Sequence, residues 1–100
     1  MTMSARVVTF QGSADGVATG AHERFRETVL PALQRQAGFA GALVLLQPTG
    51  GKVLGITLWE SAEQAQAAGA ALDRVRDANA EAMGATPTTE VFQVLARLDS

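Results

Sequence analysis

The chain has 100 residues, of which 47% are hydrophobic, and its eight basic and ten acidic side chains give a net charge of −2. This length predicts a single domain spanning residues 1–100, and the lack of cysteine excludes disulfides and thiolate metal sites. Because the basic residues are scattered, and no apolar run reaches the roughly 18 residues of a membrane span, we expect a cytoplasmic protein that binds neither nucleic acid nor a membrane.

A strand and a long helix are predicted first along the chain. Residues 6–11 are rich in β-branched and aromatic side chains, which favour a strand. Asp15 can then cap a helix over residues 18–37, in which apolar side chains recur three or four residues apart. This apolar stripe consists of Phe25, Val29, Leu30 and Leu33.

Two residues disturb the regularity of this helix. Gly20 costs about 1 kcal/mol relative to alanine inside a helix. Pro31 removes one backbone hydrogen bond and crowds the preceding turn. We therefore expect either a kink near Leu30 or a helix start after Gly20, and Gly38 supplies the left-handed stop.

An antiparallel hairpin is predicted next. The apolar runs 40–47 and 52–60 are separated by residues 48–51, which include Pro48 and a pair of glycines. A short link of this composition favours a tight connection between neighbouring strands. The second and third strands are therefore expected to pair.

A second helix and a last strand follow the hairpin. Ser61 and Gln64 match a capping box, in which the serine hydroxyl accepts the N–H three residues on and the glutamine reaches back. The apolar spacing after them predicts a helix of about 20 residues that bends near Gly69 and ends at Gly84. Residues 89–98 predict the final strand. The stripe of the second helix consists of Ala65, Ala68, Leu72, Val75 and Met83, and Asn79 interrupts it.

The order of these elements, β-α-β-β-α-β, predicts the α+β ferredoxin-like fold, a four-stranded antiparallel sheet with both helices on one face. A sheet whose other face met water should alternate apolar and polar residues. Residues 43–46 are instead all apolar, and the last strand also has apolar residues on both faces. We therefore expect a homodimer in which two identical sheets pack face to face.

The third strand divides into two faces because side chains alternate along a strand. Leu54, Ile56 and Leu58 form a uniformly apolar set, which suits a dry interface between sheets. The other set includes a glycine, which makes room for a pocket under the helices. This second set consists of Val53, Gly55, Thr57 and Trp59.

Several short segments carry a family resemblance. They are Phe10-Gln11-Gly12-Ser13 after the first strand, residues 25–27 and 29–31 in the first helix, Gly38-Phe39 before the second strand, and Leu58-Trp59-Glu60-Ser61 closing the third. In these segments the chain resembles the antibiotic biosynthesis monooxygenase superfamily, and the match extends over nearly the whole chain. The resemblance implies dimers whose two sheets close an α+β barrel, with a pocket between helices and sheet in each subunit.

The superfamily contains two catalytic branches beside members without known activity. Cofactor-independent oxygenases of aromatic polyketides form one branch, and haem-degrading enzymes form the other. The haem-degrading branch carries an iron-ligating histidine and a tryptophan on the second helix, and residues 67–70 and 75–79 contain neither. We therefore expect no cofactor, and one histidine with dispersed carboxylates offers no metal site.

Five residues are candidates for a site, each with a structural alternative. Trp59 could stack on a planar ligand, or it could be core where strand meets helix. His22 could act as a general base, or it could lie at a solvated helix edge. Asn79 could contact a ligand or tie its helix to a neighbouring backbone, and Thr57 and Arg76 present the same choice.

Two functions stay open on these grounds. The first is a homodimer that binds a small apolar or aromatic molecule and acts as a cofactor-independent monooxygenase, with a substrate that donates electrons to oxygen by itself. The pocket would then supply orientation, proton removal and exclusion of water. The second is a non-catalytic ligand-binding or structural dimer, which is favoured because no coupled acid, base and nucleophile is visible.

Overall fold

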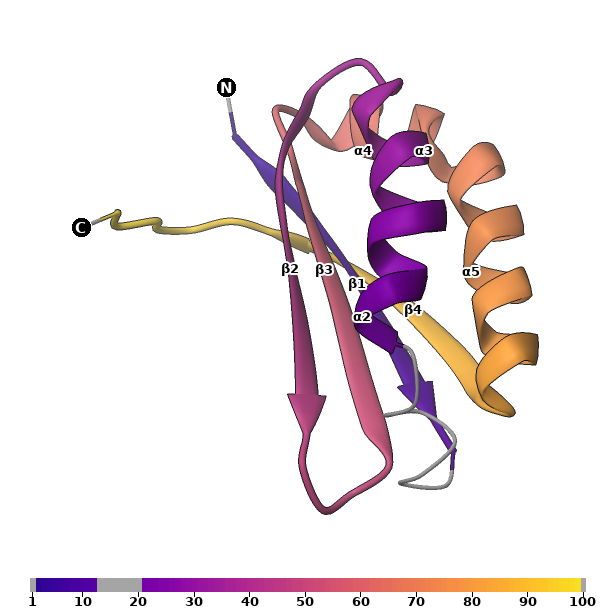
Figure 1. The fold of residues 1–100 in the computed structure, drawn as a ribbon. Coiled ribbons are helices and arrows are strands. Elements are labelled where there is room, and N and C mark those ends of the chain that lie inside the picture. The colour runs from indigo at the N-terminus through magenta and orange to yellow at the C-terminus, as the bar shows by residue number, and fades with distance from the viewer. Residues whose placement is uncertain (1, 13–20, 100) are drawn as a thin grey trace.

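The computed structural model describes residues 2–12 and 21–99, which form one sheet with the described helices on one of its faces (Figure 1). The expected cap at Asp15 and the weak point at Gly20 lie outside the described residues. The elements are β1 Ser4–Gln11, α2 Ala21–Arg24, the π-helical turn η1 Phe25–Val29, α3 Leu30–Gln34, β2 Phe39–Gln47, β3 Lys52–Trp59, α4 Ala62–Ala67, α5 Gly69–Met83 and β4 Thr86–Gln93.

The sheet has the strand order β2-β3-β1-β4, and each neighbouring pair is antiparallel. One helical segment, α2-η1-α3, lies between β1 and β2 in the sequence, and a second, α4-α5, lies between β3 and β4. This arrangement confirms the predicted α+β ferredoxin-like fold and the hairpin of β2 and β3. No described helix combines the length and the apolar character needed to cross a membrane.

The first helical segment widens into a π-turn ahead of Pro31. In η1 the hydrogen bonds reach one residue further back than in an α-helix, and the Leu30 N–H accordingly bonds to the Phe25 carbonyl. Helix α3 then starts with Pro31 in its first turn. Because proline lacks an N–H and its ring crowds the turn before it, a wider turn accommodates it better than a regular one. A π-turn therefore stands where the sequence predicts a kink. The helical segment ends at Gln34, earlier than the predicted stop at Gly38, with Arg35 as its C-cap.

The second helical segment begins at a cap and breaks once. The Ser61 hydroxyl accepts the backbone N–H of Gln64 at 3.2 Å, as predicted, while the Gln64 side chain accepts from the same hydroxyl instead of reaching the backbone. The helix breaks at Ala68, beside Gly69, where the sequence predicts a bend. It ends at Gly84, whose φ of 62° is the left-handed stop.

The last strand begins and ends earlier than the sequence predicts. β4 spans Thr86–Gln93 and not residues 89–98. Its partner β1 starts at Ser4, which pairs with Gln93, and one further hydrogen bond, from the Val94 N–H to the Met3 carbonyl at 2.9 Å, ends the contact between the two strands. An apolar run without a neighbouring strand is not held in a sheet, and residues 94–99 leave it as an extended tail (Figure 1).

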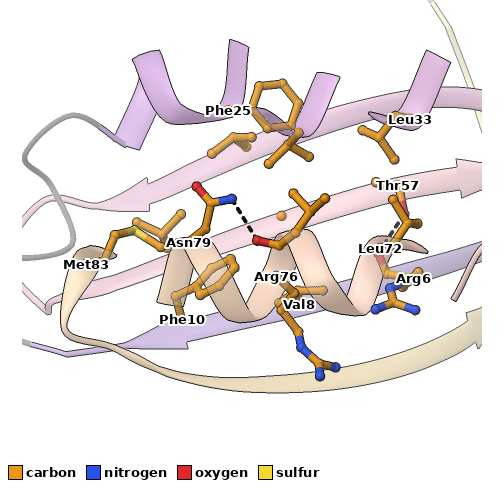
Figure 2. A pocket seen from close by; sticks show the side chains of 15 residues that line it. Arg6, Val8, Phe10, Phe25, Leu33, Thr57, Leu72, Arg76, Asn79 and Met83 are labelled. Carbon is orange, nitrogen blue, oxygen red and sulfur yellow. Dashed lines mark hydrogen bonds between the residues drawn. The ribbon is translucent and has the colours of Figure 1, made fainter. Parts of the chain in front are cut away.

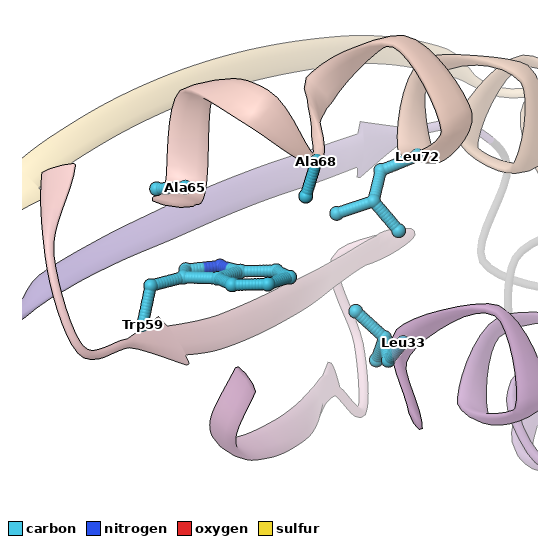
Figure 3. Packing of buried hydrophobic residues seen from close by; sticks show 5 residues of the cluster. All are labelled: Leu33, Trp59, Ala65, Ala68 and Leu72. Atoms are coloured by element: carbon cyan, nitrogen blue, oxygen red, sulfur yellow. The ribbon is translucent and has the colours of Figure 1, made fainter. Parts of the chain in front are cut away.

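Two hydrophobic clusters fill the layer between sheet and helices. The Trp59 cluster, drawn in Figure 3, consists of Leu33, Trp59, Ala65, Ala68 and Leu72. The Met83 cluster consists of Phe10, Val53, Ala80 and Met83. The Trp59 side chain is 0% exposed, and its ring meets Phe39 edge to face with centroids 5.7 Å apart. Of the two alternatives for Trp59, the structure shows core.

The face of the sheet opposite the helices is apolar along β2 and β3, and no described residue covers it. The strand register places Leu43 beside Ile56 and Leu45 beside Leu54 on this open face. Leu43, Leu45 and Phe92 are 57%, 47% and 49% exposed. The predicted apolar character on both faces of the strands is therefore present.

Candidate ligand-binding site

A cavity of about 80 Å³ lies between the helices and the sheet (Figure 2). Its wall is mostly apolar and comes from both helical segments and from β1, β2 and β3. The main apolar lining residues are Val8, Phe10, Phe25, Val29, Leu72, Val75 and Met83. The polar lining residues are Arg6, Thr57, Arg76 and Asn79. In Figure 2, Arg6 and Thr57 lie toward one end of the cavity, and Met83 lies toward the other.

Gly55 makes room for this cavity. A Cβ atom built on Gly55 would meet no other atom within 4 Å. Val53 and Thr57, on the same face of β3, also line the cavity, so the predicted division of the two faces is present for these residues.

Arg6 brings a positive charge into this apolar layer. It shares the helix-facing side of β1 with Phe10, and it is 7% exposed. Its Nη2 donates to Oδ1 of Asp73 at 2.5 Å. This hydrogen bond, with the charges of Arg6 and Arg76, lowers the pKa of the Asp73 carboxyl, although desolvation opposes the shift. Asp73 is therefore ionised at neutral pH.

Arg76 reaches the same carboxylate from α5. Its Nη1 lies 3.2 Å from Oδ1 of Asp73 and donates to Oγ1 of Thr89 at 2.8 Å. Its Nε donates to Oδ1 of Asp77 at 2.9 Å. These bonds hold the guanidinium between α5 and β4, so Arg76 both lines the cavity and ties the helix to the sheet.

Asn79 joins the second helical segment to the π-turn. It is 6% exposed, and its Nδ2 donates to the Val75 carbonyl at 2.8 Å and to Oγ1 of Thr28 at 3.1 Å. The Thr28 hydroxyl in turn donates to the Arg24 carbonyl at 2.6 Å. With both amide hydrogens used, Asn79 can offer the cavity only an acceptor oxygen. The predicted tie to a neighbouring element is made to the Thr28 side chain and not to a backbone group, and Asn79 also lines the cavity.

Trp59 touches the cavity only through Thr57. The indole N–H donates to Oγ1 of Thr57 at 2.9 Å, and the Thr57 hydroxyl donates to the Arg6 carbonyl at 3.4 Å. Thr57 lines the cavity and Trp59 does not. A ligand cannot stack on Trp59, because the ring is fully enclosed by the Trp59 cluster. The indole instead holds the Thr57 side chain in position.

For two residues, His22 and Arg6, the sequence analysis and the structure cannot be matched in this way. The backbone of His22 belongs to α2, but its side chain lies outside the described part of the structure, so its role as a base stays a prediction. Arg6 is the lining residue that the sequence analysis missed. The sequence did contain a signal for it. Arg6 and Phe10 are four residues apart in a strand, and residues an even number apart lie on the same face.

The described lining residues include no group that titrates near neutral pH. They contain no histidine, cysteine or carboxylate, and arginine stays protonated. In the described part of the chain no group of three or more potential metal ligands occurs. The wall can therefore enclose, orient and supply positive charge, while a proton acceptor must come from elsewhere.

Comparison with known sequences gives relatives of greater length. The uncharacterized proteins MT2634 and Rv2557, from two strains of Mycobacterium tuberculosis, are each 34% identical to this chain over 93 residues. The match covers 92% of this chain and 41% of each relative, so the chain spans less than half of their length. No family model matches the sequence.

Comparison with solved structures gives similar folds at low sequence identity. A Streptomyces coelicolor monooxygenase from the gene ActVA-Orf6, in complex with nanaomycin D, matches with a TM-score of 0.79 and 17% identity over 99% of this chain and 93% of that chain. SnoaB, a cofactor-independent oxygenase from Streptomyces nogalater, matches with a TM-score of 0.66 and 17% identity over 98% of both chains. The heme-degrading protein Rv3592 from Mycobacterium tuberculosis matches with a TM-score of 0.65 and 22% identity, over 97% of this chain and 99% of that one.

Proposed function

We propose that this chain, which has the ferredoxin-like fold of the antibiotic biosynthesis monooxygenase-like proteins, binds a small apolar or aromatic molecule between its helices and its sheet. The cavity carries the proposal, because its wall is apolar apart from four side chains. Small-molecule sites usually have this form, in which a few polar groups orient a ligand inside an apolar enclosure. Thr57, Arg76 and Asn79 are the proposed ligand contacts, and Trp59 holds Thr57 in place.

An aromatic ligand has to widen the cavity as it enters. The cavity volume of about 80 Å³ is smaller than the roughly 150 Å³ that accommodates benzene in an engineered cavity. Val44 lines the cavity and is 36% exposed, so the wall meets solvent at β2. Phe25 and Val29 of η1 also line the cavity, and π-turns are frequent at functional sites. Entry is proposed between Val44 and η1.

The proposed reaction is a cofactor-independent monooxygenation. An electron-rich hydroxylated aromatic substrate reduces molecular oxygen itself: a ring carbon that carries hydrogen, CH₂ in the keto tautomer, becomes a carbonyl. One oxygen atom enters the product, and the other leaves as water with the two hydrogen atoms. The cavity supplies orientation and keeps bulk water out. His22 is the proposed base. Support comes from the fold shared with SnoaB, a cofactor-independent oxygenase.

A non-catalytic ligand-binding dimer is the second candidate. One observation favours it, namely that the described lining offers no proton acceptor that titrates near neutral pH. Binding an apolar molecule needs no such group, whereas proton removal from a substrate does. Oxygen uptake separates the two candidates.

Assembly as a homodimer is part of the same proposal. Leu43, Leu45 and Phe92 are about half exposed on the open face, where the register also places Ile56 and Leu58. Large contiguous apolar patches of this kind usually mark interfaces in soluble proteins. A second copy of the same sheet, related by two-fold symmetry, covers this face with a surface of identical character.

Filling the cavity tests the binding function. Gly55→Val is expected to lower the affinity for toluene at least tenfold, because its side chain occupies the empty volume beside Gly55. The free energy of unfolding should stay equal or rise by about 1 kcal/mol, since a β-branched residue suits a strand and the void is reduced. NMR titration measures affinity and urea denaturation measures stability.

A matched change outside the cavity is the control. Gly69→Ala adds a methyl group that is not part of the lining and would lie 3.5 Å from Nη1 of Arg6. It should leave toluene affinity unchanged. Unaltered affinity in Gly55→Val would refute the site. Oxygen uptake with hydroxylated one- and two-ring aromatics, lost in Gly55→Val, supports the monooxygenase, and binding without uptake supports the non-catalytic candidate.

A further inference from the structure

We infer that the ligand of this cavity carries one anionic oxygen, a carboxylate or an ionised phenol, and that the Arg6 guanidinium receives it. The inference rests on the proposed binding function and specifies the chemical class of the ligand. It follows from how charge is distributed around the cavity and from the hydrogen-bonding capacity of Arg6.

The described cavity wall carries two cations and no anion. Arg6 and Arg76 are the charged residues that line it. The carboxylates that pair with them, Asp73 and Asp77, are not part of the lining, and their side chains are 47% and 63% exposed. Both counter-ions therefore approach from the solvent side. Arg6 and Arg76 are therefore the charged residues that border a mostly apolar cavity.

Arg6 retains unused donors at this position. A guanidinium has five N–H groups, and among the described residues Arg6 makes one side-chain hydrogen bond, from Nη2 to Asp73. Its side chain is 8% exposed, so little water reaches the remaining donors. A buried charge gains most from a charged partner, because charge-assisted hydrogen bonds are shorter and stronger than neutral ones. An anionic oxygen entering the cavity supplies such a partner.

Arg76 cannot take this role in place of Arg6. Its Nε and Nη1 already bond to Asp77, Asp73 and Thr89, which hold it against β4. It shares Asp73 with Arg6 and has Asp77 as a counter-ion of its own. The pair therefore acts as one site, in which Arg76 anchors the carboxylate and Arg6 binds the ligand.

An ionised phenol would also fit the lack of a base in the described lining. A guanidinium beside a phenol stabilises the phenolate, so the proton is released to solvent on binding. The bound substrate is then already electron-rich, and the wall does not have to remove a proton. A carboxylate would serve only to orient the ligand. Both kinds of ligand place an anionic oxygen at Arg6. Only the phenolate would also make the substrate more reactive toward oxygen.

Matched probes test the inference without any variant. At pH 7 the wild-type protein should bind benzoate at least tenfold more tightly than benzamide, which has nearly the same shape and no charge. 4-Nitrophenol, titrated below and above its own pKa, shows whether a phenolate is bound as well. Tight binding of benzoate alone assigns a carboxylate, and tighter binding of the ionised nitrophenol extends the site to phenolates. Isothermal titration calorimetry measures all of these affinities.

Two variants with opposite expected effects on benzoate affinity show whether Arg6 binds the ligand or has only a structural role. Arg6→Gln should abolish the preference for benzoate and keep benzamide binding, while Arg97→Gln, which removes an exposed guanidinium paired with Asp99, should change neither. Asp73→Asn should tighten benzoate binding several-fold, because it frees Arg6 from its competing carboxylate. A merely structural Arg6–Asp73 pair would weaken binding in both variants.

These binding measurements distinguish a wrong ligand charge from a wrong binding site. Equal affinity for benzoate and benzamide in the wild-type protein overturns the anionic ligand and leaves the apolar site standing. Lack of binding by toluene, benzoate and benzamide alike overturns the proposed site, and the inference with it.

Discussion

Trp59, Thr57 and Arg6 are linked by hydrogen bonds that run from the core to the cavity. The indole donates to the Thr57 hydroxyl at 2.9 Å, and that hydroxyl donates to the Arg6 carbonyl at 3.4 Å. A buried polar group that loses its partner costs about 1 to 3 kcal/mol, so each residue of this chain of bonds depends on the next. The single tryptophan thus shapes the cavity without being part of its wall.

Asp73 predicts how stability depends on pH. Its carboxyl pKa is lowered from 3.8 in the folded protein, chiefly by the hydrogen bond from Arg6. Folding therefore favours the ionised form, and this contribution is complete above the unfolded pKa and is lost as the pH falls through the lower folded pKa. Below a pH of about 4, the unfolding free energy of the wild-type protein should fall more steeply than that of Asp73→Asn.

Urea denaturation at pH 7, 4 and 3 measures this difference. At pH 7, Asp73→Asn should be less stable by up to about 1 kcal/mol, because Arg6 exchanges a charged acceptor for a neutral amide oxygen in a pair that is partly exposed. Asp77→Asn, which changes an exposed carboxylate paired with Arg76, serves as the control and should keep the wild-type pH dependence. Parallel curves for the wild type and Asp73→Asn would contradict the linkage.

At the level of elements, β3 and the first helical segment shape the cavity from opposite sides. β3 contributes Gly55, where a missing side chain leaves open space. The helical segment contributes the π-turn before Pro31, and that turn presents Phe25 and Val29 to the same cavity. Thr28 of the π-turn is bonded to Asn79 of α5, so the two helical segments are held together beside the cavity.

The cap at Ser61 is a prediction that concerns one element. Ser61→Ala removes the acceptor for the Gln64 N–H, and the unfolding free energy should fall by about 1 kcal/mol. Ser61→Asp keeps an acceptor at the same position and should retain most of the stability. Thermal denaturation followed by circular dichroism provides the measurement. A loss of equal size in both variants would show that the cap is not the cause.

At the scale of the whole molecule, the two faces of the sheet differ in what covers them. One face is covered by the two helical segments, which enclose the cavity (Figure 1). The open face keeps Leu43 and Leu45 about half exposed, and the tail after β4 adds Leu95 and Leu98, which are 91% and 97% exposed. This much exposed apolar surface argues for association of subunits.

Two neighbouring residues of β2 test the homodimer. Leu45 and Leu46 are 47% and 48% exposed, and they lie on opposite faces because side chains alternate along the strand. Leu45→Lys places a charge on the open face and should shift the protein toward monomer in analytical ultracentrifugation. Leu46→Lys, on the helix-facing side, should leave the dimer intact. A monomeric wild-type protein at micromolar concentration would overturn the assembly.

Particular residues show how far the candidate site could be predicted. Gly55 and Thr57 could be placed facing a pocket because alternation along a strand is a local property. Arg6 could not be assigned to the cavity with the same ease, since its counter-ion Asp73 lies 67 residues away and only folding brings them together. The end of β4 at Gln93 was missed for a related reason, because a strand ends where its neighbour ends.

The sequence by itself determined the order of the elements, the cap at Ser61, the helix stop at Gly84 and the apolar character of both faces of β2. These features arise from the spacing of side chains and from local backbone preferences, which neighbouring residues set. Only the tertiary structure decided that a cavity separates the two hydrophobic clusters, that Trp59 is core, and that Arg6 meets Asp73 beside that cavity. Those outcomes depend on how distant segments pack, because the volume left between two surfaces is a property of both surfaces together.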